Sequence, residues 1–319
     1  MKTLTPVAVI TDSAAAIPAE LLAQYQIGVV PIYVNMGRET FRSGIDLQPD
    51  SFYERLRAEP GLEIGTSVPS PSVFLNAYEK VSHWAKAIVA VHVAGRQSAC
   101  CATAELAGRE SSIPIVVVDS ETTCMGEGFV VLEAAREAAT GAPLERVVEK
   151  VRSLLPNVGL TALLESVTYA FKGGRLQSTV RAVGTFFNIQ PLIRVQHNRV
   201  SLAGQVRRRS QGVKALLAKV LDEARDAPAH LAVHFAEDED EGRNLLESLK
   251  AQINCVESYL TRVPIELGVH SGPGALAVSY YVERETLALK DQLSRLTEYA
   301  KEAIRSRLPG STQKDSAES

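Results

Sequence analysis

The sequence predicts an α/β protein of two domains, with a mostly parallel, doubly wound sheet in the first and a mixed sheet in the second. Within the first 120 of the 319 residues, four apolar runs each end in small hydroxyl or acidic residues and lead into a helical pattern. From about residue 160 this alternation gives way to a hairpin pattern. We expect a first α/β domain at 1–160, a second α/β domain at 161–282, and a helical extension with a polar tail at 283–319.

The four apolar runs, if they are parallel strands, place their carboxyl ends along one edge of the sheet. Backbone N–H groups and the positive ends of helix dipoles favour anions there, and open α/β sheets bind ligands at that edge. The sequence therefore predicts a small anionic group held by hydroxyls and backbone. The runs and the residues after them are Val7–Ile10 with Thr11-Asp12-Ser13, Ile64-Gly65 with Thr66-Ser67, Ile88–Val91 with Gly95 and Ser98, and Ile115–Val118 with Asp119-Ser120.

Helical patterns follow the strands of the first domain. The clearest one comes after Thr66-Ser67, because Ser70 is a good N-cap and Pro71 suits the first turn. Apolar side chains then recur at helical spacing from Val73 to Trp84. The helices of this domain are expected at 19–26, 72–85, 99–108 and 126–140.

The second domain is expected to begin with an antiparallel hairpin, whose strands at 189–195 and 199–206 flank Gln196-His197-Asn198. Further helices are expected at 212–225 and from the acidic run 237–241 to about 252, and further strands at 230–235 and 256–260. The last two strands are expected at 265–269 and 275–280, on either side of a tight loop, His270-Ser271-Gly272-Pro273-Gly274.

Composition narrows the classes of function. A net charge of −3 argues against a nucleic-acid partner, and no apolar stretch of about 20 residues indicates a membrane span. No apolar signal segment precedes the first strand. The cysteines form neither a C-x-x-C motif nor a Cys/His metal pattern, so we expect no metal and a reducing, cytoplasmic location. They are Cys100, Cys101, Cys124 and Cys255.

The glycine motifs predict no nucleotide cofactor. Gly126-Glu127-Gly128 is an incomplete dinucleotide fingerprint, and a G-x-x-x-x-G-K-[ST] loop is absent from the sequence. If phosphoryl transfer involves this protein, the nucleotide is expected to bind elsewhere.

Hydroxyl side chains are the first candidates for contact with a ligand. In Thr66-Ser67-Val68-Pro69-Ser70, Ser70 alone suffices for capping, which leaves Thr66 and Ser67 for a ligand. Ser98 is either an N-cap or, together with Thr66, one of two hydroxyls that chelate a carboxylate. Two neutral hydroxyls hold a carboxylate without a full counter-charge, which leaves it nucleophilic.

Three further segments each have two interpretations. In Lys172-Gly173-Gly174-Arg175, either Arg175 clamps an oxyanion or the glycines cap a helix beside a solvated arginine. Arg207-Arg208-Arg209 is either a solvated face or a docking site for a phosphate or an acidic partner. His270 is either structural or close to an acyl oxygen that it neutralises.

Together these motifs resemble those of the DegV family, the fatty acid-binding (FakB-type) subunits of bacterial fatty acid kinase, from about residue 7 to 282. Thr66-Ser67-Val68-Pro69-Ser70 is similar to the family's T-S-Q-P-S. The segment from Gly95 to Cys100 is similar to its S-x-L-S-G-T, with Ala99 and Cys100 in place of Gly and Thr. Further similar segments are Ile10-Thr11-Asp12-Ser13, Ile17-Pro18, Val30-Pro31-Ile32, Gly44-Ile45-Asp46, Val118-Asp119-Ser120, Gly173-Gly174-Arg175, Ile189-Gln190-Pro191 and Gly272-Pro273-Gly274.

The resemblance implies a DegV-like fold with a long-chain fatty acid, such as palmitate, stearate or oleate, buried within or between the domains. It implies that Thr66 and Ser98 hold the carboxylate, that a separate kinase supplies Mg-ATP, and that this chain presents substrate without being an enzyme itself. It further implies positions near the head group for Arg175 and His270, beside which we expect Ser67 and Gly174. The arginine cluster makes Arg207 and Arg209 candidates for docking of the kinase.

Two other functions stay open on the sequence. Ser98 or Ser67 could act as the nucleophile of a serine esterase or hydrolase with His270 as the base, although neither serine lies in G-x-S-x-G. The chain could also be a lipid-responsive interaction module that acts without a kinase.

Overall fold

The computed structural model describes residues 4–166, 168–169 and 189–284. Met1–Glu283 forms one compact unit and Arg284–Ser319 a second. The predicted helical extension therefore lies almost entirely outside the described residues. The predicted domain boundary at 160 falls within Val158–Leu163 (β8), and the division into two domains stays a prediction.

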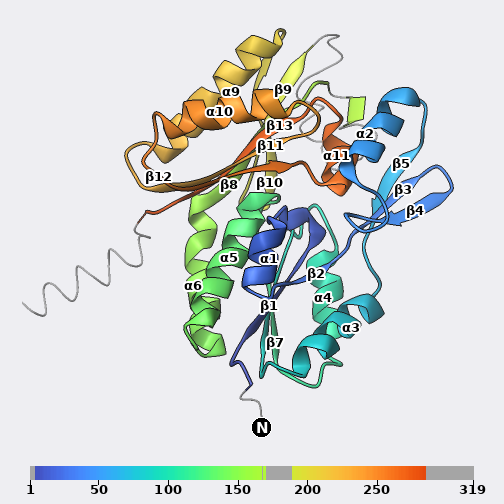
Figure 1. The fold of residues 1–319 in the computed structure, drawn as a ribbon, viewed down its shortest axis with the longest axis vertical. Coiled ribbons are helices and arrows are strands. Elements are labelled where there is room, and N and C mark those ends of the chain that lie inside the picture. The colour runs from blue at the N-terminus through green and yellow to red at the C-terminus, as the bar shows by residue number, and fades with distance from the viewer. Residues whose placement is uncertain (1–3, 167, 170–188, 285–319) are drawn as a thin grey trace, which may run out of the picture. The chain divides into compact units, whose positions relative to one another are not determined.

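A four-stranded parallel sheet of order β2-β1-β6-β7 confirms the doubly wound architecture predicted for the first part of the chain (Figure 1). Its strands are Ala8–Asp12 (β1), Gly28–Val30 (β2), Ile88–His92 (β6) and Ile115–Asp119 (β7). The helices around it are Ser13–Ala15 (η1, a 3-10 turn), Ala19–Gln24 (α1), Pro71–Ser82 (α3), Cys100–Gly108 (α4), Met125–Ala139 (α5) and Leu144–Leu154 (α6).

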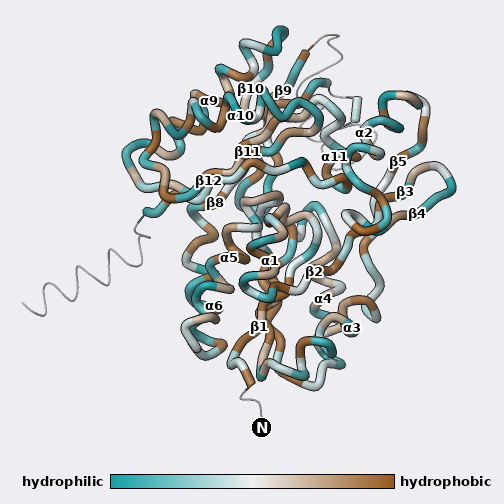
Figure 2. Tube along the Cα trace, in the orientation of Figure 1, coloured by the Kyte–Doolittle hydropathy of each residue, from teal (hydrophilic) through white to brown (hydrophobic). Residues whose placement is uncertain are grey.

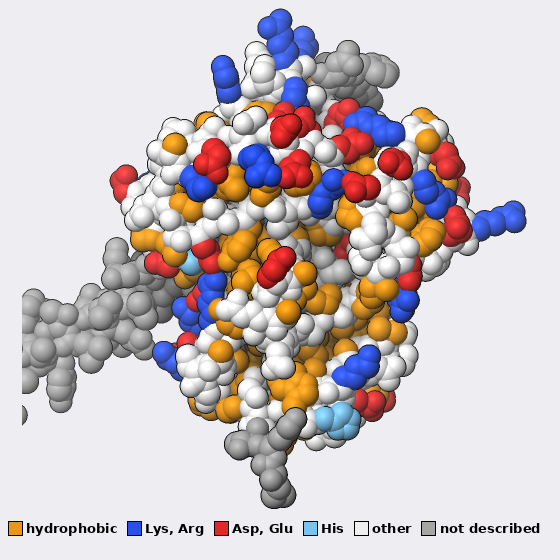
Figure 3. All heavy atoms as spheres, viewed as in Figure 1, with side chains coloured by type: hydrophobic (Ala, Val, Ile, Leu, Met, Phe, Trp, Pro, Cys, Tyr) orange, Lys and Arg blue, Asp and Glu red, His pale blue; other side chains and the backbone are white. Residues whose placement is uncertain are grey.

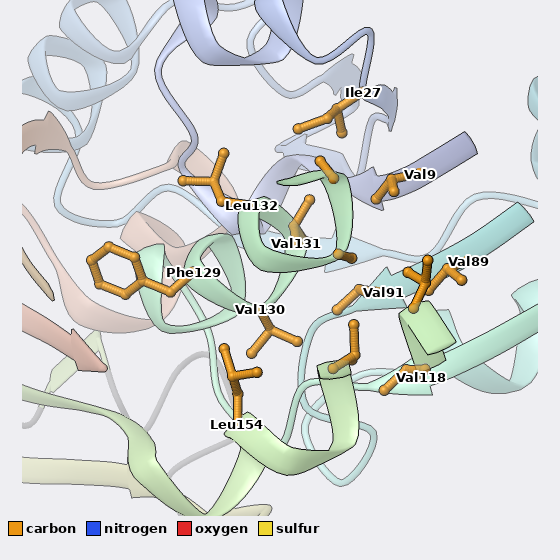
Figure 4. Packing of buried hydrophobic residues seen from close by; sticks show 14 of the residues in the cluster. Val9, Ile27, Val89, Val91, Val118, Phe129, Val130, Val131, Leu132 and Leu154 are labelled. Atoms are coloured by element: carbon orange, nitrogen blue, oxygen red, sulfur yellow. The ribbon is translucent and has the colours of Figure 1, made fainter. Parts of the chain in front are cut away.

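Both faces of the parallel sheet are buried, which explains why its strands appear in the sequence as continuous apolar runs. Val9 and Val89 face the helices α5 and α6, and Figure 4 shows these valines opposite Val131 and its neighbours. Ile10 and Ile88 are the immediate neighbours of these valines in their strands, and they pack with residues of α3 and α4 on the other face.

One of the four apolar runs does not belong to this sheet. Ile64–Ser67 (β5) pairs antiparallel with Tyr33–Met36 (β3), which also pairs with Glu39–Arg42 (β4) in a separate three-stranded sheet. The prediction of a parallel strand is therefore wrong for Ile64-Gly65. One apolar residue followed by glycine cannot fill both faces of a central strand, and β5 is only partly buried. The periodicity also did not predict the hairpin β3–β4 or Pro49–Ala58 (α2).

The second large sheet is mixed, as predicted, with the order β10-β9-β8-β13-β11-β12. The β11–β12 pairing is parallel, and the β8–β9, β8–β13, β9–β10 and β11–β13 pairings are antiparallel. Besides β8, its strands are Gln190–Gln196 (β9), Arg199–Val206 (β10), Ala229–Phe235 (β11), Cys255–Arg262 (β12) and Leu276–Val282 (β13).

The predicted hairpin at the start of this region is confirmed as β9 and β10. His197 and Asn198 at its turn both have positive φ angles, of 51° and 58°, as a two-residue turn of type I′ requires. The predicted helices after it are confirmed as Arg209–Ala224 (α9) and Glu239–Lys250 (α10), which pack against one face of the mixed sheet.

The segment predicted as a strand at 265–269 is instead a helix, Ile265–Ser271 (α11), and that prediction is wrong. Pro264 stands at its N-cap, and buried Gly268 and Val269 follow Ile265 at helical spacing. A segment of five residues is too short to distinguish the hydrophobic period of a helix from that of a strand. His270 and Ser271 therefore lie in the last turn of a helix.

Figure 2 shows hydrophobic residues along β1 and hydrophilic residues in the turn between β3 and β4.

Within the described ranges, no helix combines the length and the apolarity needed to cross a bilayer.

Candidate functional site

A pocket lies against the face of the mixed sheet that α9 and α10 leave free. Leu160 and Ala162 of β8 alternate along that face, and Ile193 and Val195 of β9 continue it. The pocket contains about 1010 Å³ of atom-free space, which includes the open solvent at its mouth. Larger side chains would fill part of this space at three positions of the lining that are alanines, namely Ala162, Ala275 and Ala277.

The pocket changes from apolar to polar where the three sheets approach one another. Thr66 and Ser67 of β5, Ser98 before α4 and His270 of α11 all line it. The Oγ1 atom of Thr66 lies 3.4 Å from Nε2 of His270. The structure thus brings four of the residues selected from the sequence to one pocket.

Ser98 lies just before α4 but is not its N-cap residue, so that prediction is wrong, and its contact with a carboxylate stays a prediction. Its hydroxyl accepts the N–H of Cys100 at 3.2 Å and donates to Cys100 Sγ at 3.1 Å, which helps to satisfy the start of α4. The N-cap position itself belongs to Ala99. Ser98 also lines the pocket, and its hydroxyl is held by its bonds to Cys100.

Ser67 and Ser70 occupy different surroundings. Ser67 accepts a hydrogen bond from Nδ2 of Asn35 at 3.3 Å, on an exposed part of the three-stranded sheet. Ser70 is the N-cap residue of α3, but its hydroxyl bonds to Ser72 and makes no capping hydrogen bond. Ser70 thus occupies the predicted N-cap position without a capping bond from its side chain, whereas Thr66 lines the pocket.

At the edge of the parallel sheet, carboxylates of the sheet itself accept several of the backbone N–H groups. Asp12 accepts the N–H groups of Ala14 and Val93, at 3.0 and 3.1 Å. Asp119 accepts those of Gly95 and Glu121, at 3.1 and 2.8 Å. These acidic residues satisfy backbone donors that the sequence pattern assigned to an anion, which leaves the hydroxyls as the polar groups for a ligand.

Three polar residues of the pocket were not selected from the sequence. Gln97 Oε1, Thr123 Oγ1 and Ser271 Oγ are buried atoms with no protein hydrogen-bond partner. Buried polar atoms are normally paired, so such atoms indicate space for a polar group of a ligand or for water. Gln97 precedes Ser98 and Ser271 follows His270 in the sequence. No motif or spacing marks either of them as a contact for a ligand.

A buried carboxyl also lines the pocket. Glu266 of α11 is 2% exposed and contacts the hydroxyls of Ser13 and Ser43. Burial raises its pKa above the ordinary value, although both hydroxyls favour the charged form. Burial also raises the pKa of Glu127, which accepts the hydroxyl of Thr11 at 3.0 Å. The sequence pattern indicated neither carboxyl.

The remaining candidates lie at the surface, beside the loop after α11, or outside the described residues. Gly174 and Arg175 lie outside the described residues. Arg207 is exposed. Arg209 binds Glu241 and donates to the carbonyl of Gly274 at 2.8 Å, so its charge helps to hold the loop after α11. No cluster of three or more potential metal ligands occurs among the described residues.

Comparison with known proteins finds similarity over most of the chain. A family model for uncharacterised proteins of the DegV family matches residues 6–283. The chain is 28% identical to protein DegV of Bacillus subtilis over 278 residues, which cover 86% of this chain and 98% of that protein. It is 27% identical to a DegV domain-containing protein of Streptomyces coelicolor over 274 residues, which cover 85% and 97%.

Solved structures agree with the sequence comparison. A DegV family protein from Thermus thermophilus, described for its fatty acid binding, has a TM-score of 0.81 and 25% identity, with 87% of this chain and 99% of that one covered. DegV from Bacillus subtilis, described as a fatty acid binding protein, has a TM-score of 0.79 and 26% identity, with 88% and 100% covered.

Proposed function

The chain belongs to the DegV family, and from this premise we propose that it binds a long-chain fatty acid and presents the carboxylate to a separate ATP-dependent kinase. The single observation that carries the proposal is the pocket, whose apolar sheet face leads to the hydroxyls of Thr66 and Ser98 and to His270. The two related structures described as binding fatty acids support it.

The apolar part of the pocket provides the affinity. A buried methylene contributes roughly 0.8 kcal/mol, so a chain of about 15 methylenes contributes on the order of 12 kcal/mol before the cost of ordering it. Alternating residues of β8 and β9, with Ala275 and Ala277, supply an unbroken apolar wall for such a chain. Palmitate, stearate and oleate are ligands of suitable chemistry.

The polar end holds the carboxylate. In the proposed complex, Thr66 and Ser98 donate to its two oxygens and His270 lies beside Thr66, so the charge is oriented without a fixed counter-ion. Ser67, Gly174 and Arg175 are proposed to lie near the same head group. In this arrangement the first domain contributes the polar loops, and the second contributes the apolar wall.

A separate kinase is proposed to carry the nucleotide. Phosphoryl transfer depends mainly on positioning and charge neutralisation, and an acyl phosphate is short-lived in water, so a carrier that holds the carboxylate at its mouth suits the reaction. Arg207, exposed just before α9, is a candidate contact, with Arg209 behind it. The surface over α9 and α10 displays both acidic and basic side chains (Figure 3).

Four unpaired cysteines favour the reducing cytoplasm as the location.

Mass spectrometry of the purified protein, native and then denatured with organic extraction, tests the proposal. A co-purifying species of fatty-acid mass is expected, and a Thr66→Ala/Ser98→Ala double variant is expected to lose it. The matched control is Thr140→Ala/Ser153→Ala, which removes two exposed hydroxyls that bond only to carbonyls of their own helices. A protein that is empty and takes up no added fatty acid would contradict the proposal.

The kinase step needs a separate readout. Incubation of the loaded protein with a fatty acid kinase catalytic protein, Mg-ATP and hydroxylamine is expected to yield an acyl hydroxamate. Bound lipid without any hydroxamate would favour an interaction module. Turnover of a chromogenic ester that is lost in Ser98→Ala would favour a hydrolase.

A further inference from the structure

A carboxyl group lines the pocket but has no role in the fatty acid binding proposed above. Glu266 is 2% exposed and lines the same pocket as Thr66, Ser98 and His270. Because Glu266 and His270 are four residues apart in α11, they lie on the same face of that helix. A bound carboxylate would therefore share its pocket with a second acidic group.

The hydrogen bonds of Glu266 connect all three sheets. Ser13 follows β1 of the parallel sheet, and Ser43 follows β4 of the three-stranded sheet. Their hydroxyls contact Oε1 and Oε2 of Glu266, respectively. Ser13 Oγ also accepts the N–H of Ile32 at 3.0 Å, so its own hydrogen is directed to Glu266. Ser43 can instead accept a hydrogen bond from a protonated Glu266.

No cation among the described residues neutralises a negative charge on Glu266, although the two serine hydroxyls and its own backbone N–H favour the ionised form. None of the ion pairs among the described residues reaches Glu266. Asp12 at the end of β1 and Glu127 on α5 are acidic, while Tyr53 on α2 and Cys124 before α5 are neutral in their ordinary protonation state. His92 is bound to Asp12 at 3.1 Å. His270 on the same helix faces Thr66.

Two like charges in one water-poor pocket disfavour one another, and the usual result is that one of them holds a proton. Building on the fatty acid binding proposed above, which this role requires, we propose that Glu266 is a positioning residue that holds a proton while the pocket contains a carboxylate. Where Glu266 is ionised in the free protein, it takes one H⁺ from solvent on binding. The ligand stays ionised, and so it stays a nucleophile.

The consequence is a coupling between pH and affinity. Below the pKa of Glu266 in the free protein, binding takes up no proton and the affinity is constant. Above it, each bound ligand takes up one proton, and the affinity falls by as much as tenfold per pH unit. His270 can also bind a proton when an anion arrives, so the two contributions must be separated by variants.

Isothermal titration of delipidated protein with monomeric oleate, from about pH 6 to about pH 9, in buffers of different ionisation enthalpy, measures both quantities. Wild-type protein is expected to lose affinity with rising pH and to take up a proton. Glu266→Gln has nearly the same shape and keeps an acceptor for Ser13, and it is expected to bind oleate without the Glu266-linked proton. His270→Asn is expected to retain that proton uptake.

Ser43→Ala provides a second test should Glu266→Gln fold poorly. It removes a hydroxyl that favours the ionised form of Glu266, so the fall in affinity is expected to begin at higher pH. Oleate binding with the same proton uptake in wild type and Glu266→Gln would overturn this role but leave the proposed function intact. An unshifted pH profile in Ser43→Ala would also count against it. Failure of the wild type to bind oleate at any pH would remove both.

Discussion

Thr66 and His270 are 204 positions apart in the chain, yet Oγ1 of Thr66 lies 3.4 Å from Nε2 of His270 at the polar end of the pocket. One residue comes from β5 of the three-stranded sheet and the other from α11, and these two elements contact each other directly. The pairing forms only when both elements reach their places in the fold. The head-group end of the pocket therefore depends on the short β3–β4–β5 sheet as much as on the parallel sheet.

Removal of the Thr66 hydroxyl is expected to weaken fatty acid binding about tenfold, or about 1.4 kcal/mol, because a hydrogen bond to a carboxylate is lost. Thr66→Ala is compared with Thr66→Ser, which keeps the hydroxyl, and with Thr103→Ala, which removes a hydroxyl that bonds to a carbonyl of the backbone at the start of α4. Displacement of a fluorescent fatty acid measures the affinities. Equal affinity in Thr66→Ala and Thr66→Ser would remove Thr66 from the site.

The elements that were predicted correctly share one property: local sequence determines their secondary structure. The parallel strands of Val9 and Val89 are apolar on both faces, and the turn at His197-Asn198 suits its backbone angles. Hydroxyls that follow such strands are then placed by the topology alone. Ser98 reached the pocket for this reason, since it follows β6.

The features that were not predicted depend on contacts between distant segments. The segment at Ile265 has too few residues to show a period, and its helix is decided by packing against α2 and β5. Gln97 and Ser271 resemble many surface polar residues, and only the assembled pocket shows their buried, unpaired atoms. Glu266 would be expected on the surface from its residue type, and its partners Ser13 and Ser43 lie 253 and 223 positions away.

Filling the apolar pocket is expected to weaken fatty acid binding without destabilising the fold. Ala277 pairs with Ala162 across β13 and β8, and both line the pocket. Ala277→Leu places a larger side chain in that space, so oleate affinity is expected to fall at least tenfold while the melting temperature stays the same or rises. Ala139→Leu, at an exposed position, is the matched control. A fall in stability with unchanged affinity would place Ala277 outside the acyl path.

A pH-dependent contribution to stability is expected from His230. Its Nδ1 lies 2.7 Å from Glu257 and its Nε2 2.9 Å from Glu283. Burial opposes the charged imidazole, but these two hydrogen bonds outweigh it and raise the pKa of His230 above 6.5. Burial likewise opposes the charge of Glu257, yet bonds from His230 and Arg136 lower the pKa of Glu257 from 4.5 to about 2.

The direction of the pH effect follows from these two shifts. The raised pKa of His230 stabilises the fold fully below 6.5, and this stability is lost as pH rises through the folded-state pKa. The lowered pKa of Glu257 contributes above 4.5 and is lost as pH falls toward about 2. His230→Gln should therefore lower the melting temperature more at about pH 5.5 than at about pH 9. His83→Gln, at an exposed site, is the control, and equal losses at both pH values would contradict the assignment.

Gly268 is expected to be required for the position of α11. A Cβ atom at this residue would lie 2.7 Å from the hydroxyl oxygen of Tyr53 and 2.8 Å from a ring carbon of Phe52, both buried on α2. Gly268→Ala should therefore destabilise the fold by about 1–3 kcal/mol, as overpacking does, and shift α11 away from α2. Because α11 carries His270 and Glu266, oleate affinity should fall as well. Gly65→Ala adds a Cβ that meets no atom within 4 Å and is the control. Loss of stability in denaturant titrations with unchanged oleate affinity would show that the helix tolerates displacement, and that the pocket does not depend on its packing against α2.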